Sequence, residues 1–132
     1  MTTLTSLGVT QIDIAGGPAS VLPSVQAELA KIPGVTTIVR YTGADRYAVS
    51  GALNRAEFSA ATGVYVATGV TFPDALAGAA VAGAKHDPLY IVKTSCIPSY
   101  TLDDFLTLAP STMTILGGTG SLSSSVEEFK GC

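Results

Sequence analysis

Two pairs of adjacent glycines, Gly16-Gly17 and Gly117-Gly118, have the residue type and the position expected of an anion-binding site. Each pair follows a β-branched run and precedes a stretch with helical spacing, where backbone amides and a helix start could hold an anion. The second pair lies in GGTGS, which is not GxGxxG, and no GxxxxGK[ST] phosphate loop occurs. Nucleotide binding is therefore disfavoured, and the favoured alternative is that glycine permits a tight turn and close helix packing.

Three aspartates, Asp45, Asp74 and Asp87, lie near the ends of predicted strands or helices. If they converged at one end of a sheet, a pair of carboxylates could hydrolyse a glycan. Each aspartate also has a simpler explanation. Asp74 fits the positive end of a helix dipole, and Asp45 stands beside Arg46 at a helix start. Asp87 precedes a proline turn. These simpler roles are favoured over glycosidase chemistry.

The only histidine, His86, stands in the polar sequence GAKHDP, where a solvated loop histidine is expected. With one histidine and two distant cysteines, Cys96 and Cys132, the chain has too few ligands for a His/Cys zinc site. No GxSxG motif supports a catalytic triad. We therefore expect no catalytic residue, no metal and no cofactor. The two cysteines are either unrelated thiols or a single disulfide, and the residues alone leave both open.

The composition excludes two kinds of partner. The chain has 132 residues and a net charge of −3, and its cations are scattered, whereas a nucleic-acid binder needs clustered cations. The longest apolar stretches, such as residues 75–84, fall short of the ~20 residues of a membrane span. The start, MTTLTSLG, lacks the basic and apolar regions of a signal peptide, so we expect any secretion signal to have been removed. The basic residues are Lys31, Arg40, Arg46, Arg55, Lys85, Lys93 and Lys130.

Short β-branched runs alternate along the chain with stretches of helical spacing. Alternation with short connections predicts parallel strands, right-handed crossovers and a doubly wound, Rossmann-like α/β sheet of about five strands with helices on both faces. The helix signals agree, because Thr71 is placed to cap a helix with Pro73 in its first turn. The predicted strands are residues 9–14, 36–41, 64–68, 89–92 and 113–116.

An internal repeat relates the two ends of the chain. The segment from Ile12 aligns without gaps on the segment from Met113, with Gly16 on Gly117, an offset of 117 − 16 = 101 residues. Ser20 aligns on Ser121 and Val25 on Val126 in the same way. The spacing suggests one domain over residues 1–132, in which residues 1–33 are the closing strand and helix of one repeat and residues 34–132 are a complete repeat.

Four segments together resemble the cell wall binding repeat 2 family. They are TGADRYAVSGALNR (residues 42–55), VYVATGVTFPDALAGAAVAG (64–83), DPLYIV (87–92) and TILGGTGSLSSSVEEF (114–129). GADRY, TGxxFPDAL and LGGTG in this order and spacing form a specific combination. The family usually has P-[IL]-L-L where this chain has PLYI, and ATA or similar where this chain has AVS after GADRY.

The resemblance implies a non-catalytic module on the bacterial cell surface that binds an anionic, teichoic-acid-like wall polymer. Repeats of this family usually come in threes, which implies packing with sibling repeats or a homo-trimer. Cysteines at these positions resemble those of exported actinobacterial members, and export favours a Cys96–Cys132 disulfide. We predict polymer contacts at the carboxyl-terminal edge of the sheet. The predicted polymer-binding residues are Arg46, Lys93, Pro88, Leu89, Tyr90, Ile91, Gly117 and Gly118.

Two alternatives of other classes stay open. A Rossmann-like sheet supports many reactions, so an enzyme acting on glycan or peptidoglycan is one alternative. The other is a self-assembling structural module whose only partner is itself. Release of reducing sugar or amine from purified wall separates the first alternative from wall binding.

Overall fold

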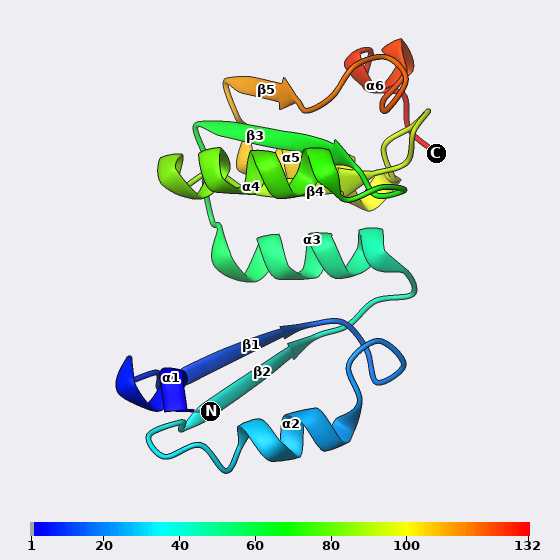
Figure 1. Cartoon of the computed structure of the whole chain (residues 1–132). Helices are drawn as coiled ribbons and strands as arrows, with labels where there is room; N and C mark the ends of the chain where they lie inside the picture. The colour runs from blue at the N-terminus through cyan, green and yellow to red at the C-terminus, as the bar shows by residue number, and fades with distance from the viewer. Residues whose placement is uncertain (1) are drawn as a thin grey trace. The chain divides into compact units, whose positions relative to one another are not determined.

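The computed structural model describes residues 2–132, so Met1, the first residue of the predicted domain, lies outside the described residues. The chain divides into two compact units, residues 1–44 and 45–132. The elements, labelled as in Figure 1, are α1 (Thr2–Ser6), β1 (Gln11–Ala15), α2 (Pro23–Leu29), β2 (Thr37–Tyr41), α3 (Arg46–Glu57), β3 (Gly63–Thr68), α4 (Pro73–Lys85), β4 (Leu89–Val92), α5 (Ser99–Leu108), β5 (Thr112–Ile115) and α6 (Ser124–Glu127).

The larger unit contains a parallel sheet of three strands in the order β4-β3-β5. Val66 of β3 lies beside Tyr90 of β4 on one side and Ile115 of β5 on the other. Each predicted strand run overlaps an observed strand, and the prediction of a parallel, Rossmann-like α/β fold is confirmed. The difference is that the five strands form two sheets, because β1 and β2 pair only with each other.

Helices cover both faces of the three-stranded sheet, with α4 on one face and α5 on the other (Figure 1). Alternation along β3 explains this arrangement, since successive side chains point to opposite faces. Val64 and Val66 join the core cluster that contains Phe105 of α5 and Val126 of α6. All six residues of β3 are buried, which accounts for the apolar character of a strand covered on both faces.

The helix starts follow the sequence signals in part. Asp45 caps α3 as its side chain accepts a 2.9 Å hydrogen bond from the Ala48 amide. The expected cap at Thr71 is wrong, because α4 begins at Pro73 with Phe72 at the N-cap position and no side-chain cap. Proline supplies the helical φ angle and has no amide that needs an acceptor, so α4 starts without a capping side chain.

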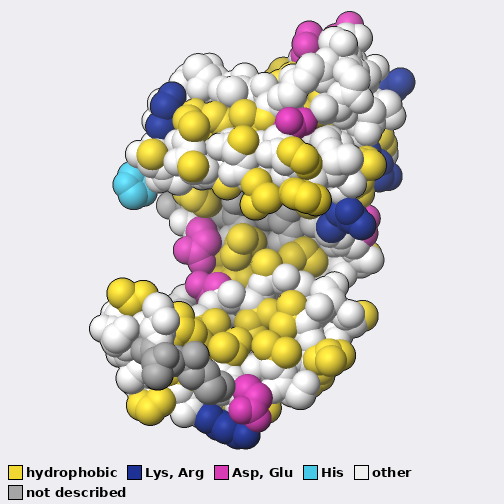
Figure 2. All heavy atoms as spheres, viewed as in Figure 1, with side chains coloured by type: hydrophobic (Ala, Val, Ile, Leu, Met, Phe, Trp, Pro, Cys, Tyr) yellow, Lys and Arg dark blue, Asp and Glu magenta, His cyan; other side chains and the backbone are white. Residues whose placement is uncertain are grey.

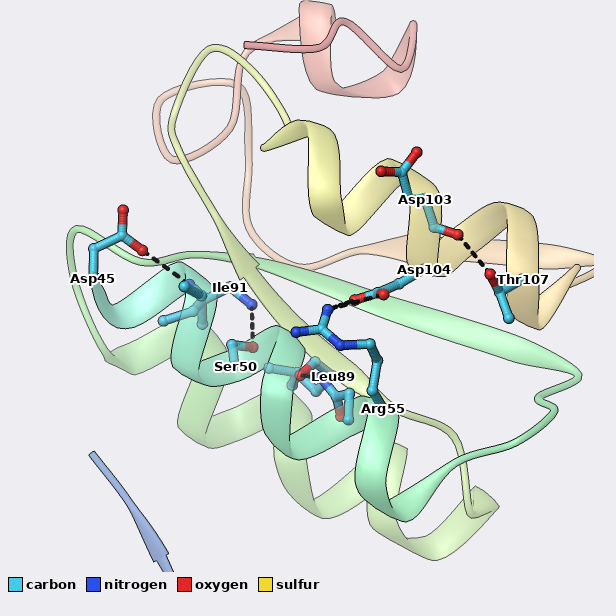
Figure 3. A network of polar contacts seen from close by, with 10 residues as sticks. Asp45, Ser50, Arg55, Leu89, Ile91, Asp103, Asp104 and Thr107 are labelled. Carbon is cyan, nitrogen blue, oxygen red and sulfur yellow. Dashed lines mark hydrogen bonds and ion pairs between the residues drawn. The ribbon is translucent and has the colours of Figure 1, made fainter. Parts of the chain in front are cut away.

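The outer edge of β4 is closed by polar side chains of α3 (Figure 3). Asn54 donates a 2.8 Å hydrogen bond to the Leu89 carbonyl, and the Ile91 amide donates a 3.2 Å hydrogen bond to the Ser50 hydroxyl. Asn54 is 5% exposed, so this amide is satisfied within the core. Side chains four residues apart on α3 therefore provide partners that a further strand would otherwise provide.

The smaller unit consists of a parallel β1–β2 pair with α1 and α2. In this pair Ile12 lies beside Ile38, and Ile14 lies beside Arg40. The Arg40 guanidinium donates to the carbonyls of Gly16 at 2.8 Å and Val21 at 2.9 Å, and to the Gln26 side chain at 2.8 Å. One cation therefore joins β2 to the Gly16 turn and to α2.

Candidate functional site

The fold brings the GADRY, FPDAL and LGGTG motifs together at the carboxyl edge of the three-stranded sheet. Arg46 of the GADRY motif donates a 2.7 Å hydrogen bond to the Gly69 carbonyl, which follows β3. The ring of Tyr47 lies against Gly69, where a Cβ atom would come within 2.5 Å of Tyr47 Cε1. A side chain at position 69 would therefore displace the Tyr47 ring, and glycine permits the close contact where the first two motifs meet.

The second contact joins the FPDAL and LGGTG motifs. Gly117 has a φ of +101°, and a Cβ atom there would lie 2.5 Å from Asp74 Oδ2 in the first turn of α4. Gly118 is open, with no atom within 4 Å of the position of a Cβ. The predicted residues Gly117 and Gly118 therefore lie at the same sheet edge as Gly69, one packed against a carboxylate and the other accessible.

A pocket of about 240 Å³ opens between the start of α3 and the start of α4. Phe72 and Val70 on its wall are 73% and 63% exposed. Hydrophobic side chains gather on the surface of the larger unit over α4 in Figure 2. The pocket thus combines a guanidinium with solvent-exposed apolar groups. Its lining is Arg46, Thr68, Gly69, Val70, Thr71, Phe72, Ala75 and Ile91.

The charges at this edge are arranged so that two cations have no acidic partner. Among the described residues the ion pairs are Lys31–Glu28 and Arg55–Asp104, and neither Arg46 nor Lys93 takes part in one. Asp45 caps α3 and also accepts a 3.3 Å hydrogen bond from the Tyr100 hydroxyl. Burial raises the pKa of Tyr100, and the Asp45 carboxylate raises it further.

Lys93 directly follows β4 and is exposed, as a residue past the end of a strand is expected to be. It forms an antiparallel bridge with Cys96, so residues 93–96 make a tight turn at the carboxyl edge. Lys93 therefore lies at the same edge of the sheet as Gly69 and Gly117, which follow the neighbouring strands.

The predicted contacts along residues 88–91 are mostly unavailable to a polymer. Pro88 is fully buried, and Tyr90 is 0% exposed with its ring packed edge-on against Phe105 at a centroid distance of 5.1 Å. These two residues therefore serve the core. Leu89 and Ile91 are half-buried, and their backbone groups bond to α3. Of the four, Ile91 alone lines the pocket beside Arg46.

The predicted disulfide is confirmed. Cys96 and Cys132 are joined, with their Cα atoms 5.5 Å apart and a sequence separation of 36. The backbone reinforces the link, since the Cys132 amide donates a 3.1 Å hydrogen bond to the Ile97 carbonyl. The bond ties the segment after α6 to the loop after β4.

The three aspartates do not converge. Asp45 and Asp74 lie near the carboxyl edge, but Asp87 lies at the opposite edge, where it accepts a 3.0 Å hydrogen bond from the Gly63 amide at the start of β3. His86 is exposed and ends α4 in the left-handed conformation, as expected of a loop histidine. Among the described residues, no three His, Cys, Asp or Glu side chains gather as metal ligands. Nor is any described helix long and apolar enough to cross a membrane.

Sequence reasoning missed two polar links made by side chains of α3. The Arg55 guanidinium donates to both carboxylate oxygens of Asp104, at 3.0 and 2.8 Å, and so joins α3 to α5 (Figure 3). The 49 positions between these residues left no local signal. Ser50 and Asn54 are four residues apart after the predicted helix start at Asp45, and that spacing could have indicated that both lie on one helix face.

Comparison with known proteins adds a family and a fold. The family described as Cell wall binding domain 2 (CWB2) matches residues 40–127. The solved structure of Cwp8 from Clostridium difficile has a TM-score of 0.75 and 24% identity, covering 93% of this chain and 20% of that one. Cwp6 from Clostridium difficile has a TM-score of 0.84 and 20% identity, covering 98% and 21%. At these identities the likeness concerns the fold, and this chain spans about a fifth of each structure. No curated protein sequence matches the chain.

Proposed function

Because this chain belongs to the Cell wall binding domain 2 family, and is therefore a cell-wall-binding module, we propose that it holds a surface protein to an anionic, teichoic-acid-like wall polymer. The attachment is non-covalent and involves no catalysis. The proposed site is the carboxyl edge of the three-stranded sheet. The observation that carries the proposal is the pocket in which Arg46, free of any acidic partner among the described residues, lies beside the start of α4.

The local chemistry of the pocket suits a phosphate-bearing polymer. Arg46 uses one Nη1 hydrogen bond on Gly69, and a guanidinium has five N–H donors, so others remain for a phosphate. The first-turn amides of α4 have no side-chain cap and add a positive end of a helix dipole. Phe72 offers an exposed ring to the apolar faces of the polymer's sugar or alditol units.

The net charge of −3 opposes long-range attraction of a polyanion, so binding rests on local groups and not on steering. Asp74 lies in the first turn of α4 and is turned toward Gly117. Lys93 lies at the same edge and adds a second cation. A site built from a few cations should weaken as salt rises, because exposed charges are screened over about 8–10 Å at physiological ionic strength.

We further propose that the native protein acts outside the cell and that residues 1–33 are the closing part of a preceding repeat. The support for the second point is that the turns at Gly16 and Gly117 share a positive φ, +134° and +101°. They also share a hydrogen bond to the carbonyl one residue on, from Ser20 to Gly17 and from Ser121 to Gly118, both at 2.9 Å.

Co-sedimentation with purified Gram-positive walls tests the proposed ligand. The chain should pellet with intact walls and remain in the supernatant after acid extraction of the anionic polymers. Equal pelleting before and after extraction would show that the ligand is another wall component. Reducing sugar and free amine are measured in the same samples, and their release above a wall-only control would favour the enzymatic alternative.

A further inference from the structure

The Tyr90 hydroxyl is a buried polar group that no other group of the fold satisfies. Tyr90 is 0% exposed, and its hydroxyl oxygen has no hydrogen-bond partner among the described residues. Buried polar groups nearly always have a partner, because leaving a hydrogen bond unmade costs free energy. In the PLYI motif this tyrosine stands where the family usually has leucine, which would fill the core without that cost. The hydroxyl therefore needs an explanation other than packing.

The hydroxyl lies beside an ion pair at a pocket of about 330 Å³. The pocket lies where α3 and α5 end, is lined by Arg55, Tyr90 and Asp104 among others, and shares no lining residue with the pocket at Arg46. Burial raises the pKa of Tyr90 most, the Asp104 carboxylate raises it further and the Arg55 guanidinium lowers it, so both charges act on the phenol. At neutral pH the phenol is protonated and available as an O–H donor.

Arg55 and Asp104 hold each other and still have capacity for a ligand. Arg55 donates to the two Asp104 oxygens through Nη1 alone, at 3.0 and 2.8 Å (Figure 3). A guanidinium has five N–H groups, so those on Nε and Nη2 remain as donors. The Arg55 side chain is 49% exposed and the Asp104 side chain 7% exposed. Solvent therefore reaches the cation, while the carboxylate lies deeper in the pocket.

The balance of charge in the pocket selects a neutral ligand. Arg55 and Asp104 neutralise each other, and a charged ligand would leave one charge unpaired in a partly buried site, which is unfavourable. The guanidinium and the Tyr90 phenol offer donors beside one acceptor, the carboxylate. A secondary amide has the complementary pair of groups, because its C=O accepts and its N–H donates.

The other walls of the pocket fit a sugar that carries such an amide. Phe58 is half-buried and Leu108 is buried, and they provide apolar surface for a methyl group and for the face of a sugar ring. Ser59 and Thr107 are exposed and carry hydroxyls. The Thr107 hydroxyl donates a 2.9 Å hydrogen bond to the Asp103 carbonyl, so its oxygen can still accept from a sugar hydroxyl. The volume lies within the range of small-molecule sites, about 300–1,000 Å³.

We propose that this pocket binds the acetamido group of one N-acetylated hexosamine unit. The acetamido carbonyl accepts from the Tyr90 hydroxyl and from Arg55, the acetamido N–H donates to Asp104, and the methyl group packs against Phe58. The site takes a neutral sugar at a place separate from the Arg46 pocket, so it goes beyond the proposed polyanion site and does not depend on it. One neutral sugar unit held by so few polar groups should bind with a dissociation constant in the millimolar range.

Titration of the isotope-labelled full chain with N-acetylglucosamine, followed by NMR, tests the proposal. The amides of residues 54–59 and 104–108 should shift saturably at millimolar sugar. Glucose, which lacks the acetamido group, should not shift them. Equal shifts with glucose, or unshifted amides in these two segments at saturating N-acetylglucosamine, would overturn the proposal.

Removal of one oxygen atom separates a binding role of the phenol from a structural one. Tyr90→Phe should weaken N-acetylglucosamine binding about tenfold, as expected for loss of one hydrogen bond, although the same change removes an unsatisfied hydroxyl and should stabilise the fold. Tyr100→Phe is the matched control, because the Tyr100 hydroxyl bonds to Asp45 at the start of α3 and does not line the pocket. The control should bind like the wild type. Equal affinity of Tyr90→Phe and the wild type would contradict the proposal.

Two sources of the sugar are distinguished with wall fractions. Glycan fragments of acid-extracted walls and the released anionic polymer are added in turn to the labelled chain. The fraction that shifts the amides of residues 54–59 and 104–108 supplies the sugar, and the proposal is wrong if neither fraction does so. The Arg46→Glu/Lys93→Glu variant should respond to N-acetylglucosamine as the wild type does, so failure of the Arg46 site and failure of this site give different results.

Discussion

The β1–α2 and β5–α6 segments are related in sequence and share a turn, but they are fastened in different ways. In both, a glycine with positive φ ends the strand, and a serine amide four residues later closes the turn. The Gly16 turn is held by a cation, Arg40, whereas the Gly117 turn packs against an anion, Asp74. The tail after α6 is additionally held by the Cys96–Cys132 disulfide.

The comparison shows which features are local and which depend on neighbours. The turn conformation recurs because the glycine, and the serine four residues on, recur in the sequence. The contacts that hold the two turns differ because different elements lie beside them. The Gly16 turn lies beside β2, and the Gly117 turn lies beside the start of α4.

Loss of the disulfide should have the largest effect and should act on the second segment. The Cys96→Ser/Cys132→Ser variant removes a bridge across 36 positions. It should lower the free energy of unfolding by about 3–4 kcal/mol in the chain-entropy description. Chemical denaturation measures the loss in the free energy of unfolding. Hydrogen exchange should show faster exchange of the amides of β5 and α6, with those of β1 unaffected. Equal loss of protection in β1 and β5 would contradict the claim that the disulfide stabilises only the β5–α6 segment.

Replacing Arg40 should act on the first segment. Arg40→Met retains most of the apolar stem and removes three donated hydrogen bonds. The free energy of the opening that exposes the amides of β1 and β2 to exchange should fall by about 2 kcal/mol, because two carbonyls lose a charged donor. Native-state hydrogen exchange measures the local change. Unchanged protection of β1 and β2 would show that Arg40 does not hold the Gly16 turn.

Alanine at the two equivalent glycines should have unequal effects. A side chain at positive φ costs about 1–2 kcal/mol at either site. Gly117→Ala should cost more than Gly16→Ala, because its Cβ would lie 2.5 Å from Asp74 Oδ2, whereas a Cβ at Gly16 would lie 3.2 Å from Ser20 Cβ. Adding Asp74→Ala should recover part of the loss only in Gly117→Ala. Equal losses in the free energy of unfolding of both single variants, measured by urea denaturation, would show that contacts with Asp74 and Ser20 do not set the cost.

A change of pH should act mainly on the core that includes α6. Burial raises the pKa of Tyr90 well above its ordinary value of 10.0, and the Asp104 carboxylate adds to the shift. The native state therefore favours the protonated phenol, so this stability is fully present below about pH 10 and is lost as the pH rises further.

Tyr90→Phe should remove that alkaline loss. The Tyr90 hydroxyl is buried without a hydrogen-bond partner, so the variant should gain up to about 1 kcal/mol at neutral pH. Thermal denaturation at pH 7 and at pH 11 makes the comparison. A variant that is destabilised at pH 7 would show that the phenol has a role beyond filling the core. A variant that loses stability in alkali as the wild type does would show that other groups cause the alkaline loss.

The fold was largely predictable from the sequence, because strand position depends on short β-branched runs and parallel pairing on their alternation with helices. The division into two sheets was not predictable in this way. Pairing partners depend on which strands lie adjacent in three dimensions, and hydrophobic periodicity contains no information on that. The start of α4 was mispredicted because Thr71 is a suitable cap by type, while Pro73 lets the helix begin without one.

The site was predictable where a contact follows from an element end. Arg46 and Lys93 were placed correctly at the carboxyl edge because each adjoins the end of an element. Pro88 and Tyr90 were assigned to the ligand by resemblance alone, and their burial shows that the same residues pack the core. The Arg55–Asp104 pair links residues 49 positions apart, and nothing local in the sequence indicates such a pair.

The most direct test of the account is wall binding by a charge-reversed pocket. The Arg46→Glu/Lys93→Glu variant reverses the two unpaired cations at the carboxyl edge. Lys31→Glu/Lys85→Glu is the matched control, because it changes the net charge equally at exposed lysines that do not line the pocket. Both variants are checked for fold by circular dichroism and are then sedimented with intact walls at low and at physiological salt. If the pocket holds the polymer, the first variant stays in the supernatant and the control pellets like the wild type. Pelleting of the first variant at the wild-type level would show that it does not.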